Sequence, residues 1–255
     1  MITNPLEKSG MMTETTDSLA ERFLGRAIQI SLFGAEIGIN ITPTYDPRML
    51  IFRNLSFEEQ FKAVQKIELN CEIFSSIVRE KQDLRSSSSV VWKSMNCLGL
   101  RPPSDFFDKL TDDDVVQVYS KDNVHRFSNL KFFEVCSYTL EHIYALPWDV
   151  LWKRDEEDTK YLLNCVAEVL GSDAKTTHVF HQPPHRTLEA SSVFRYEALY
   201  ALKCIAPLFD RVTGERCGFI VRESAELLNR HTPLEEERML HEYEARNKAP
   251  ALTLL

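Results

Sequence analysis

The stretch IAPLFDRVTGERCGFI, residues 205–220, decides the fold. Two apolar runs in it are separated by the polar segment DRVTGE, which places Gly214 where a hairpin loop needs a residue with positive φ. The stretch therefore predicts an antiparallel hairpin with strands over residues 194–209 and 217–221. Gly218, inside the second strand, indicates a close approach to a neighbouring strand.

The residues before this hairpin predict a second hairpin followed by helices. The predicted elements, in chain order, are a strand from Val115, a turn at 121–123, a partner strand at 124–127, short helical turns to 143, an amphipathic helix from 155 to Gly171, and a strand at 177–180. Together with the closing hairpin, this order predicts an α+β fold whose strands pair in an antiparallel sheet.

Two stretches of this region carry a resemblance to a known family. FSNLKFFEVCSYTLEHI, residues 127–143, has an Asn after the second strand, then an aromatic residue, a small-Tyr pair and a Leu-Glu helix. In residues 205–220, a Pro-Leu-x-Asp strand end turns through Gly-Glu into an apolar strand. Both stretches resemble PAS sensor domains over residues 112–224, although Ser137 stands where many members have Gly. The resemblance implies a five-stranded antiparallel sheet with flanking short helices.

A sheet and helices of this kind would enclose an apolar cavity that binds a small molecule by shape. The candidate ligand-binding residues are Phe133, Tyr138, Trp148, Phe180, Tyr200, Cys204 and Phe219. Core packing is the alternative for each of them, because aromatic side chains commonly fill small cores. These residues do not identify the ligand, and a small apolar metabolite and haem are both candidates.

The clearest helix lies in the first half of the chain. Ser56 and Glu59 form a capping box, and apolar residues then follow at spacings of three and four. The candidate interface residues on this seam are Phe57, Val64, Ile67, Cys71, Phe74 and Val78. Such a seam must contact an apolar partner, which is either the rest of the chain or a second copy in a homodimer.

These patterns divide the chain into four parts. Residues 1–18 are expected to be a disordered tail, 19–110 a mainly helical segment with a possible dimerisation helix at 56–80, 111–225 the PAS-like domain, and 226–255 a short C-terminal helix and tail. The last part is too short for an output domain. We therefore expect signalling to proceed through association with another protein.

Histidines and aspartates supply the only metal-like patterns. His178, His181 and His185 lie close together, but Pro183 and Pro184 favour an extended loop, so a solvated loop is the alternative to a metal site. His142 is the formal axial ligand if the domain holds haem. Residues 112–114, three consecutive aspartates, are interpreted as a solvated edge.

Composition excludes several other classes. Only 8 of the 255 residues are glycine and none has the spacing of a phosphate-binding loop, which argues against nucleotide chemistry. The net charge of −8 argues against nucleic acid, and we see no signal peptide, bilayer-spanning run or C-x-x-C pair. No catalytic constellation stands out. We expect a cytoplasmic, non-enzymatic sensor, with a ligand-free structural adaptor or a haem or metal redox sensor as alternatives.

Overall fold

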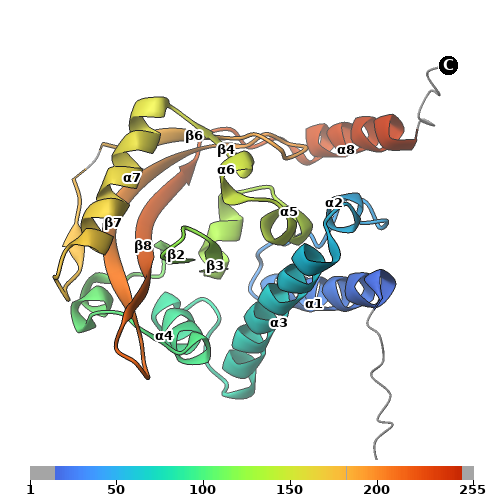
Figure 1. The fold of residues 1–255 in the computed structure, drawn as a ribbon. Helices are drawn as coiled ribbons and strands as arrows, with labels where there is room; N and C mark the ends of the chain where they lie inside the picture. The colour runs from blue at the N-terminus through green and yellow to red at the C-terminus, as the bar shows by residue number, and fades with distance from the viewer. Residues whose placement is uncertain (1–14, 182, 249–255) are drawn as a thin grey trace, which may run out of the picture.

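An antiparallel sheet of eight strands organises the computed structural model, which describes residues 15–181 and 183–248 (Figure 1). The main path of hydrogen-bonded neighbours is β3 (His125–Ser128), β2 (Val115–Ser120), β8 (Arg216–Leu227), β7 (Glu197–Asp210), β6 (His185–Glu189) and β4 (Trp152–Arg154). Two shorter strands, β1 (Leu100–Arg101) and β5 (His178–Val179), pair with other parts of β7. The sheet is curled, and the chain is an α+β protein, as predicted.

The prediction of five strands was too small, and one closing strand was misplaced. Residues 177–180 contribute only the short β5, whereas the full strand beside β7 is β6. The sequence pattern missed β6 because its three buried positions are His185, Thr187 and Glu189, which are polar, while exposed residues alternate with them. A strand with polar residues on its buried face lacks the apolar alternation that identifies strands.

The closing hairpin follows the prediction from residues 205–220. Gly214 adopts φ +70° in the loop between β7 and β8, and the Asp210 carboxylate accepts hydrogen bonds from the backbone N–H groups of Val212 and Thr213, both at 2.8 Å. A Cβ atom on Gly218 would lie 2.2 Å from the carbonyl oxygen of Tyr119 on β2. The close approach expected at Gly218 is therefore confirmed.

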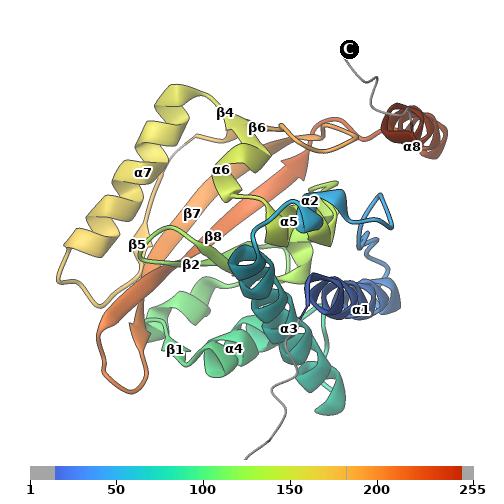
Figure 2. The ribbon, with the colours of Figure 1, turned by 45° about the vertical axis from the view of Figure 1, so that its right-hand side comes forward.

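Helices make up most of residues 16–98 and lie against the sheet, and further helices lie between and after the strands (Figure 2). They are α1 (Thr16–Glu36), α2 (Leu50–Arg53), α3 (Phe57–Arg79), α4 (Ser87–Leu98), η1 (Ser104–Lys109), η2 (Leu130–Glu134), α5 (Leu140–Ala145), α6 (Trp148–Leu151), α7 (Glu156–Gly171) and α8 (Pro233–Lys248). Residues 16–18 belong to α1, so the expected tail of 1–18 extends too far, and its first fourteen residues lie outside the described part. The C-terminal helix is confirmed as α8.

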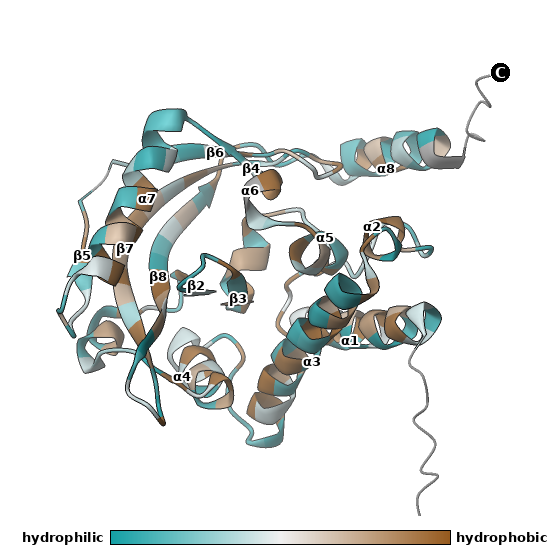
Figure 3. Cartoon of the chain, in the orientation of Figure 1, coloured by the Kyte–Doolittle hydropathy of each residue, from teal (hydrophilic) through white to brown (hydrophobic). Residues whose placement is uncertain are grey.

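The near-heptad seam of α3 packs inside the chain. The capping box at Ser56 and Glu59 is confirmed, and brown apolar segments alternate with teal ones along the helix (Figure 3). Its central members, Val64, Ile67, Cys71 and Phe74, are buried in the main core, while Phe57 and Val78 at the two ends are 50% and 39% exposed. The seam is thus occupied by the rest of the chain, and a dimer through those four central residues is wrong for this fold.

Both faces of the central strands are covered. One face of the sheet, here called the outer face, carries Val116, Val118 and Ile220, which belong to the same core as the N-terminal helices. The expected domain boundary near residue 110 therefore does not separate two cores. Tyr119 and Phe219 lie on the inner face, in a second cluster with Val169 of α7. Burial on both faces explains why β2 is buried at every position but its last.

Candidate ligand cavity

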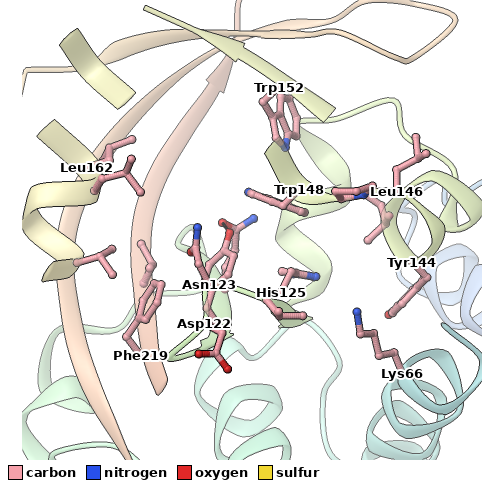
Figure 4. Close-up of a pocket in the computed structure, with 18 of the residues that line it drawn as sticks. Lys66, Asp122, Asn123, His125, Tyr144, Leu146, Trp148, Trp152, Leu162 and Phe219 are labelled. Carbon is pink, nitrogen blue, oxygen red and sulfur yellow. Dashed lines mark hydrogen bonds between the residues drawn. The ribbon is translucent and has the colours of Figure 1, made fainter. Parts of the chain in front are cut away.

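A cavity of about 1040 Å³ opens between the inner face of the sheet and the helices around it (Figure 4). The sheet wall comes from β2, β3, β4, β7 and β8, and α7 closes one side with Leu162, Leu163 and Val166. The opposite side comes from α5, α6 and α3, where α3 contributes Ala63 and Lys66. The N-terminal helical segment therefore forms part of the cavity wall.

Aromatic rings from paired strands line the centre of the cavity. Tyr119 is the register partner of both His125 on β3 and Phe219 on β8. Its ring stacks on Phe219 with centroids 5.1 Å apart and an interplanar angle of 13°. The His125 ring stacks on Trp148 of α6 at 4.5 Å and 11°. Because strand register sets these neighbours, the sheet itself positions the rings that a ligand would contact.

A bulge in β7 brings two further apolar residues into the cavity wall. Leu202 pairs with Glu223 and Cys204 pairs with Arg222, which leaves residue 203 as an extra residue in the strand. The bulge reverses the alternation, so that Leu202 and Ile205 both line the cavity. Cys204 consequently lies on the outer face.

Polar groups without partners also line the cavity. Trp152 is 7% exposed, and its indole N–H has no hydrogen-bond acceptor in the described part of the chain; Figure 4 shows this nitrogen directed into the cavity. The Glu223 carboxyl is buried on β8, and no donor for it is found among the described residues. Burial raises the pKa of Glu223, and the nearby positive charge of Arg154 partly opposes that rise. An N–H donor and a carboxyl thus face the cavity with unused capacity.

A lysine and a histidine meet at the α3 side of the cavity. Lys66 points into the cavity close to His125 (Figure 4). Burial lowers the pKa of Lys66, and the positive charges of Arg126 and Lys62 lower it further. Burial and the Lys66 charge together lower the pKa of His125 to about 3, so its ring is neutral at pH 7. The His125 Nε2 lies 2.8 Å from the hydroxyl of Ser128.

The structure places only two of the predicted ligand-binding residues, Trp148 and Phe219, in the cavity wall. The other five lie elsewhere: Phe133, Tyr138, Tyr200 and Cys204 are buried in the main core, and Phe180 is half-buried beside α7. Tyr138 has a structural role, because its hydroxyl donates to the carbonyl of Leu151 and accepts from the backbone N–H of Ala190. Core packing, the alternative to ligand contact, describes these residues.

The residues that sequence reasoning missed are Tyr119, His125 and Trp152. The sequence predicted a strand from Val115 but did not show which of its side chains would face a cavity. The nearly continuous apolar run VVQVY at residues 115–119 is the sequence signal that could have indicated a strand covered on both faces. Trp152 follows Leu151 at the start of β4, and the local sequence does not indicate that its side chain faces a cavity.

The histidine patterns form no metal site. Within residues 15–181 and 183–248, no group of three His, Cys, Asp or Glu side chains is placed to hold an ion. His181 is exposed, His185 is buried beside Tyr200, and His178 approaches Glu168 at 3.7 Å. His142 is buried outside the cavity lining, its Nδ1 lies 2.6 Å from the Thr139 hydroxyl, and burial lowers its pKa to about 4. It is therefore not placed to ligate a haem in the cavity.

The aspartate run is also not a simple solvated edge. Asp114 is fully buried, and its carboxylate accepts hydrogen bonds from Lys203 Nζ at 2.5 Å and from the backbone N–H of Thr111 at 2.8 Å. Arg222 lies 3.9 Å from the same carboxylate. Asp114 thus anchors the start of β2 on the outer face of the sheet, whereas Asp112 and Asp113 are exposed as expected.

In comparisons with known proteins, the sequence matches no family model and no curated protein. Among the helices of the described residues, none is long and apolar enough to span a bilayer.

Proposed function

We propose that this protein is a cytoplasmic sensor whose PAS-like domain binds a small ligand and signals by association with another protein. The observation that carries the proposal is the aromatic cavity of about 1040 Å³, which is large enough to enclose a drug-sized molecule. A solid interior would have favoured a ligand-free structural adaptor instead.

The order of elements supports the PAS resemblance. Two strands, β2 and β3, are followed by the short η2, α5 and α6, then by the longer α7, and finally by β6, β7 and β8. The first and last of these strands, β2 and β8, pair in the middle of the sheet. Three additional short strands extend the sheet beyond the five that the resemblance implies.

A route from ligand to output is built into the cavity wall. Ala63 and Lys66 line the cavity, while Val64 and Ile67 on the same helix pack into the core beside α1. At the other end of the wall, the Glu141 carboxylate of α5 accepts a hydrogen bond from the Phe52 N–H at 3.0 Å. Occupancy of the cavity would act on α3 and α5, and through them on the N-terminal helices that a partner protein could contact.

Native mass spectrometry of freshly purified protein tests the proposal, with Val166→Trp as the blocking variant. Val166 lines the cavity from α7, so an indole at this position would fill part of the space. The neighbouring Ala167 is exposed, and Ala167→Trp is the matched control. We expect a bound small molecule in the wild type and the control but not in Val166→Trp. Displacing the bound molecule should change the rate of hydrogen exchange in residues 57–79.

The absence of bound mass in all three proteins, together with no thermal shift across metabolite pools, would contradict ligand binding. A bound molecule that leaves the exchange of α3 unchanged when it is displaced would contradict the proposed route of the signal.

A further inference from the structure

The cavity lining also indicates the chemical class of the ligand, an inference that rests on the proposed function. Three features of the wall bear on it: an unpaired ammonium group at Lys66, stacked aromatic rings in the centre, and an unused N–H donor on Trp152. Each of the two polar groups would hydrogen-bond to an acceptor atom, and the rings favour a flat apolar body.

Lys66 is a half-buried cation of the cavity wall. In the described part of the chain its ammonium has no hydrogen bond and no ion pair, and the two glutamates at the start of α3 have other partners. Glu58 binds Lys62 at 2.6 Å, and Glu59 is held by the N–H and hydroxyl of Ser56. Asp122 also lines the cavity mouth, but it forms no ion pair with Lys66.

The surroundings of Lys66 favour an anion. Its side chain is half-buried, and the other cations nearby, Arg126 and Lys62, disfavour its charged form. A carboxylate placed beside this ammonium would relieve both effects, since a charge-assisted hydrogen bond is strong where water is partly excluded. The neutral ring of His125, stacked on Trp148, provides a flat surface next to that position.

We propose that the cavity binds a flat, apolar molecule with a single carboxylate, which contacts Lys66 while the ring system lies against the aromatic wall. A carbonyl or ring acceptor further along the molecule would accept from Trp152 Nε1. Glu223 lies on the β8 wall, whereas Lys66 lies on α3, so the ligand carboxylate and the Glu223 carboxyl face different sides of the cavity.

Three pyrene derivatives test this class: pyrenebutyrate, pyrenebutanol and pyrenebutylamine, which share one flat ring system and differ in the terminal group. Energy transfer from tryptophan to pyrene reports binding near Trp148 and Trp152. At pH 7.5 we expect the wild type to bind pyrenebutyrate about tenfold more tightly than the alcohol, and the amine most weakly, as expected for one charge-assisted hydrogen bond.

The variants Lys66→Gln, Lys66→Arg and Lys62→Gln locate the effect. Lys66→Gln should remove the tenfold preference for the acid while leaving the alcohol affinity unchanged, and Lys66→Arg should restore it. Lys62→Gln is the matched control, because Lys62 lines the same mouth but already pairs with Glu58. Thermal unfolding establishes that each variant is folded.

The outcomes separate the two proposals. Equal affinities for acid and alcohol, a preference for the amine, or a preference that survives in Lys66→Gln would overturn the anionic class and leave ligand binding intact. Failure of all three probes to bind would also overturn the class, and only the additional absence of any molecule in native mass spectra would remove the sensor function with it.

Discussion

Glu189 and Glu223 are both buried glutamates with raised pKa values, but their surroundings differ completely. The Glu189 carboxylate at the end of β6 accepts from the N–H and hydroxyl of Ser137, the hydroxyl of Ser192 and the N–H of Tyr196. Glu223, on the inner face of β8, has no donor among the described residues. A buried polar group that is fully bonded holds a fold together, whereas one that faces a cavity unbonded is available to a ligand.

The two faces of β8 differ in charge pairing. Arg222 and Glu223 are adjacent in sequence and project to opposite sides of the sheet. On the outer face, Arg222 lies beside Asp114, whose carboxylate is bonded to Lys203 and Thr111. On the inner face, Glu223 meets the cavity. One strand thus contributes Arg222 to an ionic cluster, in which Arg222 Nε and Nη1 have no hydrogen-bond partner among the described residues, and Glu223 to the cavity wall.

The largest expected effect on stability is at the ionic cluster on the outer face of the sheet. Asp114→Ala removes the carboxylate that pairs with Lys203 and Arg222 and leaves the Arg222 guanidinium buried without a counter-charge. We expect it to lower the free energy of unfolding in urea by about 3–5 kcal/mol. Asp113→Ala, at an exposed neighbouring position, should change it by less than about 0.5 kcal/mol. Equal effects of the two substitutions would show that the outer cluster does not stabilise the fold.

A smaller loss is expected at the bonded glutamate. Glu189→Gln keeps the size of the side chain but replaces one acceptor oxygen with an N–H₂ donor facing groups that already donate. We expect the free energy of unfolding to fall by about 1–3 kcal/mol, the cost of leaving buried groups without partners. Denaturant unfolding measures this loss, and an unchanged midpoint would mean that the four contacts contribute nothing.

The same substitution at the cavity should have the opposite sign. Glu223→Gln removes a carboxylate that is desolvated without a donor, so we expect a gain of about 1 kcal/mol at pH 7. Because the folded-state pKa of Glu223 is raised, its protonated form stabilises the fold fully below the unfolded pKa of about 4.3, and that contribution is lost as pH rises through the folded value.

The gain from Glu223→Gln should therefore disappear as the pH is lowered to about 4, where wild-type Glu223 is protonated in the folded state. Unfolding curves of both proteins across this pH range measure it. A destabilised variant at pH 7 would show that Glu223 is bonded after all. A gain that does not depend on pH would show that the ionised carboxyl is not its cause, and in either case the contrast with Glu189 would fail.

Local signals in the sequence predicted much of the fold. The capping box at Ser56, the turn at Gly214 and the close approach at Gly218 depend on residues adjacent in sequence or on the absence of a Cβ, and all are confirmed. The missed strand β6 shows the limit of such signals. Its buried side chains are polar, and their partners come from segments distant in sequence, such as Ser137 for Glu189.

The sequence by itself determined the first hairpin of β2 and β3, the helix α7, the antiparallel closing hairpin and the amphipathic seam of α3, because these follow from periodicity, capping and turn chemistry over a few residues. Only the tertiary structure decided that the seam packs inside the chain and that Tyr119, His125 and Trp152 surround a cavity. Those outcomes depend on which faces of separate elements meet, on the bulge after Leu202 that reverses the alternation of side chains between the two faces of β7, and on burial of β2 from both sides. A local sequence pattern encodes none of these.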